Sequence, residues 1–365
     1  MQSLAEQSEA QTVVEAVDKP LTLILKERHR RGWLIILALV LLLLAVMVAG
    51  VVLGAVEVAL PDLLQALGLW PRPKLLDAST KAIIMELRLP RVFLAAMVGA
   101  ALAIGGTVFQ ALFRNPMADP YVLGVSAGAA LGATAAFLFP TKYLPLGIGL
   151  VPMAAFGGAI FTVILVCRLA RTDGYISLSS MLLSGIAVGT FFTALVSLLM
   201  YFSRRHLQQV VFWLMGGFDR ASWQYVRLAL PYFVLGSTVA LVHARSLNAL
   251  LLGEETAANL GVEVERTKNW LLVGASLLTA TAVAVSGPIG FVGLIVPHAL
   301  RLLVGPDHRL LLPASALGGA TLMVAADTLA RTIIAPTELP VGLIMSLGGA
   351  PFFISMLRRQ KRSDI

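Results

Sequence analysis

The stretch that decides the fold is Asn269–Leu300, NWLLVGASLLTATAVAVSGPIGFVGLIVPHAL, which contains no Asp, Glu, Lys or Arg. A helix of about 20 apolar residues already crosses the ~30 Å hydrocarbon core of a bilayer, so this stretch is too long for one ordinary span. Ser286-Gly287-Pro288 near its middle is a break signal. We therefore predict two helices, one that ends near Val285 and a shorter one from about Gly290, which either spans the membrane or re-enters it.

Outward from this stretch, the same absence of charge marks further candidate spans, because a charged side chain is costly at the bilayer centre. Together with the split stretch they predict an all-α polytopic membrane protein with ten transmembrane helices. The other stretches are Gly32–Val56, Val92–Phe113, Pro120–Thr141, Tyr143–Cys167, Gly174–Ser203, Leu228–Ala244, Leu310–Ala326 and Leu339–Leu357.

The composition agrees with a membrane protein and excludes several other classes. Hydrophobic residues make up 58% of the chain and charged residues 13%, with a mean hydropathy of +0.85; soluble proteins carry about 25% charged residues. The single cysteine, Cys167, excludes a disulfide-stapled secreted domain, and the scattered histidines have no metal-ligand spacing. We expect no metal site in this chain. On so apolar a chain, the net charge of +8 indicates membrane topology and not nucleic-acid binding.

Basic residues near the ends of the chain predict its orientation, because Lys and Arg are enriched on the cytoplasmic side. They cluster at 26–31, before the first span, and at 358–362, after the last. Both termini are therefore predicted to be cytoplasmic, with residues 1–31 as an N-terminal tail and 359–365 as a C-terminal tail. The N-terminal tail is polar and lacks the early apolar run of a signal peptide. The outer loops 72–91 and 204–227 are also basic, either as solvated loops or as a surface for an acidic partner.

Two connections between spans have sequence patterns that predict local structure. Phe113–Pro120 contains an Asn-Pro and an Asp-Pro step, which favour a stiff turn. In Leu247–Gly261, the apolar residues at 250, 251, 257 and 260 are predicted to share a helical face while two glutamates face water, and two glycines end the helices. This segment is either a plain connection or a docking platform for a soluble partner.

Small and charged residues inside the spans suggest close packing and local pairing. Gly124, Gly128 and Gly132 fall four apart, which lets helices approach closely, either within one subunit or at a dimer seam. Asp327 and Arg331 are also four apart, at the spacing of a helical ion pair.

Several motifs, taken in order, resemble one family. They are Glu86-Leu87-Arg88-Leu89-Pro90-Arg91, Val98–Ala103, Gln110–Pro116, Trp213–Phe218, Ser286–His298 and Glu338–Gly342. With these motifs, residues 80 to 358 resemble a permease subunit of the iron-chelate and vitamin B12 ABC importers, the FecCD-type family.

The resemblance implies an architecture and a set of partners. A ten-helix permease domain, here 32–358, pairs with a second copy of itself, and the transport path follows the two-fold axis. Two cytoplasmic ATPase subunits bind ATP and Mg, and a periplasmic binding protein delivers the substrate across a bacterial inner membrane. This chain has no Gly-x-x-x-x-Gly-Lys-Ser/Thr motif, which fits a permease that is not itself an enzyme and holds no cofactor.

The resemblance also implies roles for individual residues, taken over by motif. Arg88, Arg91 and Arg331 match arginines that meet glutamates of the binding protein, a pairing suited to the planar guanidinium. The segment Leu247–Gly261 matches the coupling helices that seat in the ATPase. The residues of the coupling segment are Leu250, Gly253, Glu254, Glu255, Ala257, Leu260 and Gly261, and those at the cytoplasmic gate are Asn115, Met117, Ser179 and Ser180.

The function expected from these observations is import by alternating access. The substrate is predicted to be an iron chelate, either a siderophore or haem, with cobalamin as the alternative, because no residue separates these substrates. An ion-coupled secondary transporter is the alternative of another class. It would need an acidic or histidine side chain at mid-membrane, and no Asp or Glu lies mid-span.

Overall fold

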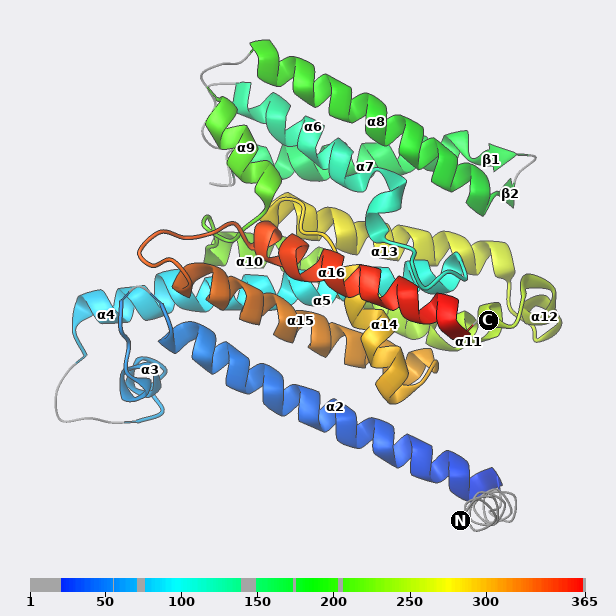
Figure 1. The fold of residues 1–365 in the computed structure, drawn as a ribbon, viewed down its shortest axis with the longest axis horizontal. Helices are drawn as coiled ribbons and strands as arrows, with labels where there is room; N and C mark the ends of the chain where they lie inside the picture. Colours follow the sequence, from blue (N-terminus) through cyan, green and yellow to red (C-terminus); the bar gives the residue numbers. More distant parts are fainter. Residues whose placement is uncertain are drawn as a thin grey trace.

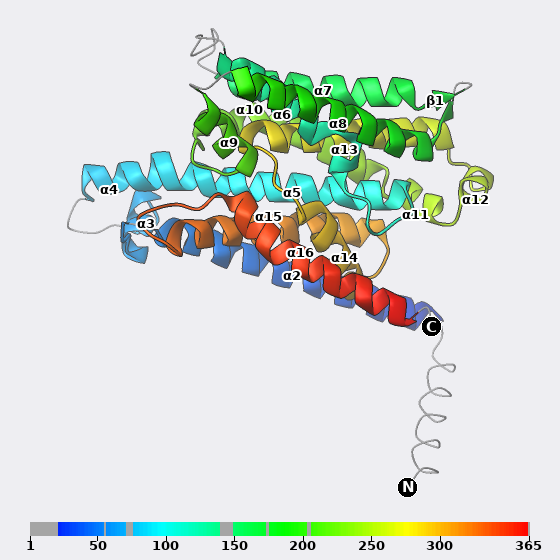
Figure 2. The same ribbon diagram turned by 45° about the horizontal axis from the view of Figure 1, so that its top comes forward.

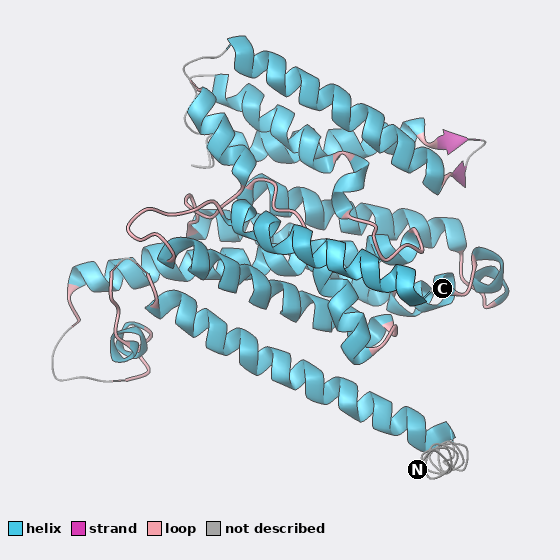
Figure 3. Ribbon diagram, viewed as in Figure 1, coloured by secondary structure: helices cyan, strands magenta, loops and turns pink. Residues whose placement is uncertain are grey.

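The computed structural model describes residues 21–54, 56–70, 76–138, 149–172, 175–202 and 206–363. Apart from one pair of two-residue strands, its regular structure is helical, so the chain is the all-helical polytopic membrane protein that the sequence predicted (Figure 3). In chain order the elements are α2 (Leu21–Val52), α3 (Leu60–Ala66), α4 (Ala78–Ala82), a π-helical segment (Ile83–Arg88), α5 (Leu89–Leu112), a 3₁₀ turn (Pro120–Leu123), α6 (Val125–Leu138), α7 (Leu150–Leu169), β1 (Arg171–Thr172), β2 (Tyr175–Ile176), α8 (Leu178–Phe202), α9 (Leu207–Met215), α10 (Trp223–Val242), α11 (Ala244–Leu251), α12 (Glu254–Asn259), α13 (Val264–Ser286), α14 (Val292–Val304), α15 (His308–Thr332) and α16 (Val341–Ser363).

Each predicted span contains one of the main helices. Within the described residues, seven helical stretches are long and apolar enough to cross a membrane. Three shorter apolar stretches accompany them, namely α6, α14 and the part Val341–Ser355 of α16. The predicted break in the longest charge-free stretch is confirmed: α13 ends at Ser286, Gly287 takes a left-handed φ of 70°, and α14 starts at Val292. A glycine is needed there because other residues rarely adopt that conformation.

One predicted span is wrong in its extent. Pro120–Thr141 was expected to form one continuous helix, but the chain makes a 3₁₀ turn up to Leu123 and begins α6 only at Val125. Gly124 between them has a φ of 71°, which ends the turn. Gly124 therefore caps a turn, and only Gly128 and Gly132 of the predicted small-residue face lie on α6. A Cβ on Gly132 would lie 2.0 Å from the Ala154 oxygen, so this face packs within the chain.

Helices extend into both of the expected tails. Helix α2 starts at Leu21, well before the first apolar run, and its candidate span covers Arg30–Val52. Helix α16 continues to Ser363, through most of the predicted C-terminal tail. Residues 1–20 of the N-terminal tail lie outside the described residues.

Helix α5 forms the centre of the bundle. It is buried along almost its whole length and packs against α13, α14 and α15, while α2 lies along α15 on one side and α6, α7 and α8 form a layer on the other (Figures 1 and 2). Glycines bring the central helices together: a Cβ on Gly106 would lie 1.9 Å from the Gly293 oxygen, and one on Gly99 would lie 2.1 Å from the Gly319 oxygen. Such backbone contacts are typical of helices packed in membranes.

The bundle has two distinct ends. The start of α2, strands β1 and β2, helices α11 and α12 and the end of α16 lie at one end, which we call the α11–α12 end (Figure 1). Helices α3, α4 and α9 lie at the other, the α3–α4 end. The candidate sites fall at these two ends.

Candidate functional site

A cluster of five charged side chains occupies the α3–α4 end of the central helices. Arg91 Nη2 lies 2.9 Å from Asp327 Oδ1, and Arg331 Nε lies 3.1 Å from Asp327 Oδ2, which confirms the predicted pairing within α15. Arg91 Nη1 also bonds Glu338 Oε2 at 2.8 Å. The Asp327 carboxylate thus bridges two guanidinium groups, and its side chain is only 1% exposed. Arg88 lies beside them, so the structure brings the three predicted docking arginines together.

Two of these arginines hold the end of α2. Arg88 Nη1 donates to the carbonyls of Val51 and Val52 at 2.7 and 2.8 Å, and Arg331 Nη2 donates to the Gly50 carbonyl at 2.9 Å. The last carbonyls of a helix lack partners within the helix and carry partial negative charge, so cations are favoured there. Arg88 and Arg331 are accordingly buried and hydrogen-bonded within the chain. Among the three arginines, Arg91 is the one placed beside an exposed acid.

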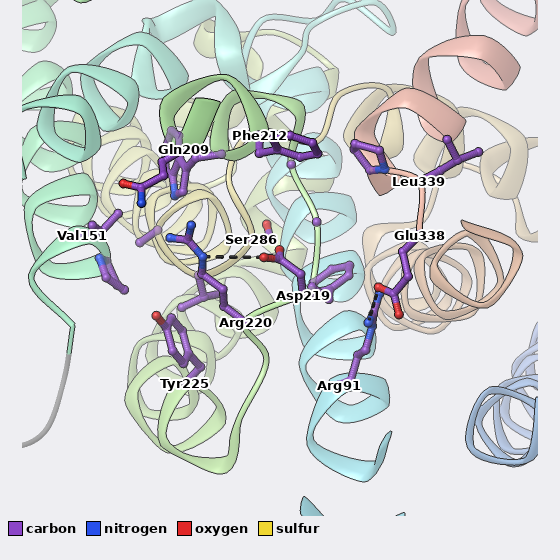
Figure 4. Close-up of a pocket in the computed structure, with 18 of the residues that line it drawn as sticks. Arg91, Val151, Gln209, Phe212, Asp219, Arg220, Tyr225, Ser286, Glu338 and Leu339 are labelled. Carbon is purple, nitrogen blue, oxygen red and sulfur yellow. Dashed lines mark hydrogen bonds and ion pairs between the residues drawn. The ribbon is translucent and has the colours of Figure 1, made fainter. Parts of the chain in front are cut away.

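A pocket of about 370 Å³ opens beside Arg91 and Glu338 (Figure 4). Its walls are formed by the start of α7, the end of α13, helix α9, the segment 216–220 and residues 338–340. Its lining mixes apolar side chains such as Phe212 and Leu339 with polar ones such as Gln209 and Arg220 (Figure 4). The described residues contain no group of His, Cys, Asp or Glu suited to a metal ion. A pocket of this kind can contact a bulky solute without ligating it.

Three glycine-containing motifs meet at the base of this pocket. Gly217 N donates to the Ser286 carbonyl at 2.8 Å, and Gly342 N donates to the Gly216 carbonyl at 3.2 Å. A Cβ on Gly216, whose φ is 68°, would lie 2.4 Å from the Pro288 oxygen. The sequence motifs around 216, 287 and 342 are therefore close junctions of backbone.

The sequence placed the lining residues Gln208, Gln209, Phe212, Asp219 and Arg220 only within the basic loop 204–227 and predicted no pocket there. The available signal was their position around the motif Trp213–Phe218, which indicated a family but no role.

The predicted coupling segment forms two short helices at the α11–α12 end. Gly253 and Gly261 have φ values of 120° and 85°, and they stand between and after α11 and α12 as predicted. The predicted shared apolar face is wrong: Leu250 and Ala257 are buried, whereas Leu251 and Leu260 are exposed. The chain changes direction at Gly253, so residues before and after it do not follow one helical period.

The acidic residues of this segment differ in their surroundings. Glu254 lies 3.2 Å from Lys268 Nζ on α13, whereas Glu255 is exposed beside it. Leu251, Leu252 and Leu260 are exposed as well. The surface at this end therefore combines exposed leucines with acidic side chains.

A polar network fixes α11 to the start of α15. Asn248 Nδ2 donates to Asp307 Oδ1 at 2.7 Å, and His308 N donates to Asn248 Oδ1 at 2.8 Å. Burial alone would raise the pKa of the Asp307 carboxyl, but hydrogen bonds from Arg309 and Asn248 outweigh it and lower the pKa to about 2. Asp307 therefore stays ionised, and the link persists, throughout the physiological pH range.

The predicted gate residues follow α5 and begin α8. The end of α5 lies at the α11–α12 end, as do β1 and the start of α8 that follows it (Figure 2). After α5, Asn115 Oδ1 accepts a hydrogen bond from Met117 N at 2.9 Å, which makes the stiff turn that the Asn-Pro step predicted. Ser179 and Ser180 lie in the first turn of α8, where Ser180 N donates to Ser177 Oγ at 3.4 Å. Within the described residues no hydrogen bond joins the two segments.

Comparison with known proteins identifies the family of this chain. The sequence matches the FecCD transport family over residues 40–359. The chain belongs to the FecCD transport family. Its predicted identification as a permease of that family is thereby confirmed, and the chain is not itself an ATPase.

Individual FecCD relatives cover most of the chain. The cobalamin import system permease protein BtuC of Halobacterium salinarum is 51% identical over 280 residues, which are 77% of this chain and 74% of that protein. The hemin transport system permease protein HmuU of Yersinia pestis is 45% identical over 281 residues, which are 76% of this chain and 84% of that protein. A solved inward-facing ABC transporter assigned to the metal-chelate type is 34% identical, with a TM-score of 0.77 over 89% of this chain and 99% of that chain.

Proposed function

We propose that this FecCD permease forms the membrane path of an ABC importer for a large metal chelate, and that cobalamin is its first candidate substrate. The observation that carries this proposal is the 51% identity, over most of the chain, to a relative named as a cobalamin permease. Iron chelates, which the sequence analysis favoured, are the second candidate, supported by the relative named for hemin. The lining of the pocket beside Arg91 does not separate the two, because it offers contact surface without metal ligands.

The proposed topology has ten spans with both termini in the cytoplasm. Helix α2 starts and α16 ends at the same end of the bundle, as an even number of crossings requires (Figure 1). Basic residues at 26–31 and 358–362 favour the cytoplasm for that end. One relative comes from an archaeon, so we propose the cytoplasmic membrane of a prokaryote in place of a bacterial inner membrane specifically.

The proposed assembly contains two copies of this chain, two ATPase subunits and a binding protein. Helices α8 and α16 carry exposed apolar side chains, such as Phe191 and Leu347, that a second copy or lipid would cover. Exposed leucines of α11–α12 would seat in the ATPase, and the network from Asn248 to Asp307 would carry its movement to α15. The segments with Asn115, Met117, Ser179 and Ser180 would then open or close the path.

At the α3–α4 end we propose Arg91 as the principal docking cation. Arg88 and Arg331 are buried against the carbonyls of α2, whereas Nη1 of Arg91 pairs with an exposed acid, so an incoming glutamate meets Arg91 at the lowest cost. Glu338, 44% exposed and bonded to Arg91, would compete with that glutamate.

Uptake into proteoliposomes tests the proposed function. The permease is assembled with its ATPase and offered cobalamin, haem and a ferric siderophore, each with its binding protein. We expect accumulation of cobalamin that requires both ATP and the binding protein. Accumulation of an iron chelate alone would overturn the substrate, and uptake without the ATPase would overturn the proposed mechanism.

A leucine on α12 tests the ATPase surface. Leu260→Asp places a charge in the proposed contact, and we expect about tenfold less ATPase to co-purify with the permease, as for a central interface residue. Leu260 is 64% exposed and Leu69, at the opposite end, is 68% exposed, so Leu69→Asp is a matched control that should retain the ATPase. Equal losses in both variants would contradict the placement of the ATPase on α12.

If Glu338 competes with the binding protein for Arg91, substitutions of these two residues should change the affinity for the binding protein in opposite directions. Glu338→Gln frees Arg91 and should strengthen binding of the binding protein by about two- to fivefold, the range of an exposed ion pair. Arg91→Gln should weaken it by at least as much. Surface plasmon resonance on the assembled transporter measures both, and weaker binding in both variants would contradict the competition.

A further inference from the structure

A second pocket lies at the α11–α12 end, between the start of α2 and the end of α14. Its volume is about 350 Å³, and its walls are formed by Arg31, Gly32, Arg301 and residues 302–306. The arginines come from segments far apart in the sequence. This pocket belongs to none of the surfaces proposed above for the substrate, the ATPase or the binding protein.

Close packing of α2 creates this pocket. Gly32 is buried, and a Cβ there would lie 2.6 Å from Leu310 Cδ1 at the start of α15. Because Gly32 has no side chain, α2 approaches α15 at this level, and the neighbouring Arg31 is brought to the end of α14. The two arginines thus line one pocket.

The charges of these arginines are not neutralised by the pocket itself. None of its lining residues is acidic. Within the described part of the chain, the hydrogen bond of Arg301 runs from Nη2 to the Gln110 Oε1 at 3.0 Å, and no ion pair involves Arg31. Asp307, the acid that follows the pocket in sequence, is bonded to Asn248 and Arg309. The carbonyls at the end of α14 are the remaining polar groups, and Arg301 stands one turn before them.

The surroundings of the pocket are apolar and lie at the edge of the membrane. Leu302 is 76% exposed, and Leu303 and Trp33 are also exposed. The candidate span of α2 begins at Arg30, so Arg31 stands at the level where apolar helix meets water. Tryptophan is enriched at this level in membrane proteins.

We propose that this pocket binds the phosphodiester group of a membrane phospholipid, with the phosphate on Arg31 and Arg301 and the acyl chains along Leu302 and Leu303. Basic pockets between helices at the membrane surface suit anionic headgroups, and arginine presents a fork that matches phosphate oxygens. The site lies in the cytoplasmic leaflet under the topology proposed above. It does not depend on the identity of the transported substrate.

Native mass spectrometry of the delipidated full-length protein, with any subunits that remain bound, tests this site. Dioleoyl-phosphatidylglycerol is titrated into wild type and into Arg31→Gln, whose exposed side chain is removed without disturbing the contact of Arg301 with Gln110. We expect Arg31→Gln to bind the first lipid about tenfold more weakly, as for loss of a charged hydrogen bond. Arg31→Lys should remain within about threefold of wild type, because it keeps the charge near the surface.

Arg30→Gln is the matched control, since it removes the same charge one residue earlier from a side chain outside the pocket. It should bind the first lipid as wild type does. Equal weakening in Arg30→Gln and Arg31→Gln would overturn the proposal in favour of diffuse surface charge. Displacement of the lipid by millimolar inorganic phosphate would also overturn it, because the pocket would then be a site for free anions.

Discussion

Replacement of Asp327 by alanine is expected to destabilise the permease by about 3–5 kcal/mol, the cost of breaking a buried ion pair by removing one partner. The carboxylate accepts from both Arg91 and Arg331, and its side chain is 1% exposed. Its loss leaves two guanidinium groups close together and less solvated than in water. Arg331 would keep only its bonds to the carbonyls at the end of α2, and Arg91 would keep only its pair with the exposed Glu338. Unfolding in mixed micelles of mild detergent and dodecyl sulfate measures the change in free energy of unfolding.

Glu338 provides the control in the same cluster. It pairs with Arg91 at 2.8 Å but is 44% exposed, so Glu338→Ala should cost no more than about 1 kcal/mol. Asp327→Asn keeps the shape and removes the charge, and it should fall between the two. If Asp327→Ala unfolded no more easily than Glu338→Ala, the buried cluster would not stabilise the end of α2.

This cluster also shows where the resemblance to a family reaches its limit. The resemblance at Arg88-Leu89-Pro90-Arg91 implied docking arginines, which stays a prediction. The spacing of Asp327 and Arg331 predicted an ion pair, and the structure confirms this pair. The contact of Arg88 with the carbonyls of Val51 and Val52 joins residues far apart in sequence. No local sequence pattern predicts such a contact, because it depends on where α2 ends relative to the start of α5.

The main apolar helices were predictable because the bilayer imposes a length on them and excludes charge. The break between α13 and α14 was predictable as well, since Gly287 and Pro288 stand together in an otherwise apolar stretch. The break at Gly124 was missed because that glycine also fits a small-residue face, and sequence alone does not separate the two roles. Gly253 was recognised as a helix end. The exposure of Leu251 and Leu260 on either side of it was not predicted, because it depends on the direction that the chain takes after this glycine.

Helix α15 runs from one end of the molecule to the other and contacts the polar groups at both. Helix α15 begins beside Asp307, which is bonded to α11 through Asn248, and it carries Asp327 and Arg331 near its other end. It packs along α5 with Gly319 against Gly99. A displacement of α11 would therefore reach the arginine cluster through one continuous element, which suits the docking site and the ATPase contacts that we propose at opposite ends.

A substitution at the contact of α5 with α14 is expected to have the second large effect on the free energy of unfolding. Gly106→Ala adds one methyl group whose carbon would lie 1.9 Å from the Gly293 oxygen, and the nearest atoms are backbone. Backbone cannot rotate away as a side chain does, so α14 must shift from α5. We expect a loss of about 1–3 kcal/mol in the free energy of unfolding, the usual range for overpacking. The same micelle assay measures it.

Gly157→Ala separates this steric effect from the general effect of alanine in a helix. Gly157 lies in α7 with open space around its Cβ position, so alanine meets no atom there within 4 Å. Alanine is favoured over glycine in helices by up to about 1 kcal/mol, and Gly157→Ala should therefore be neutral or stabilising. The two substitutions are chemically identical and are predicted to have opposite signs. If both stabilised the protein, α5 and α14 would have room for a methyl group, and the close approach of these helices at Gly106 would not hold the bundle together.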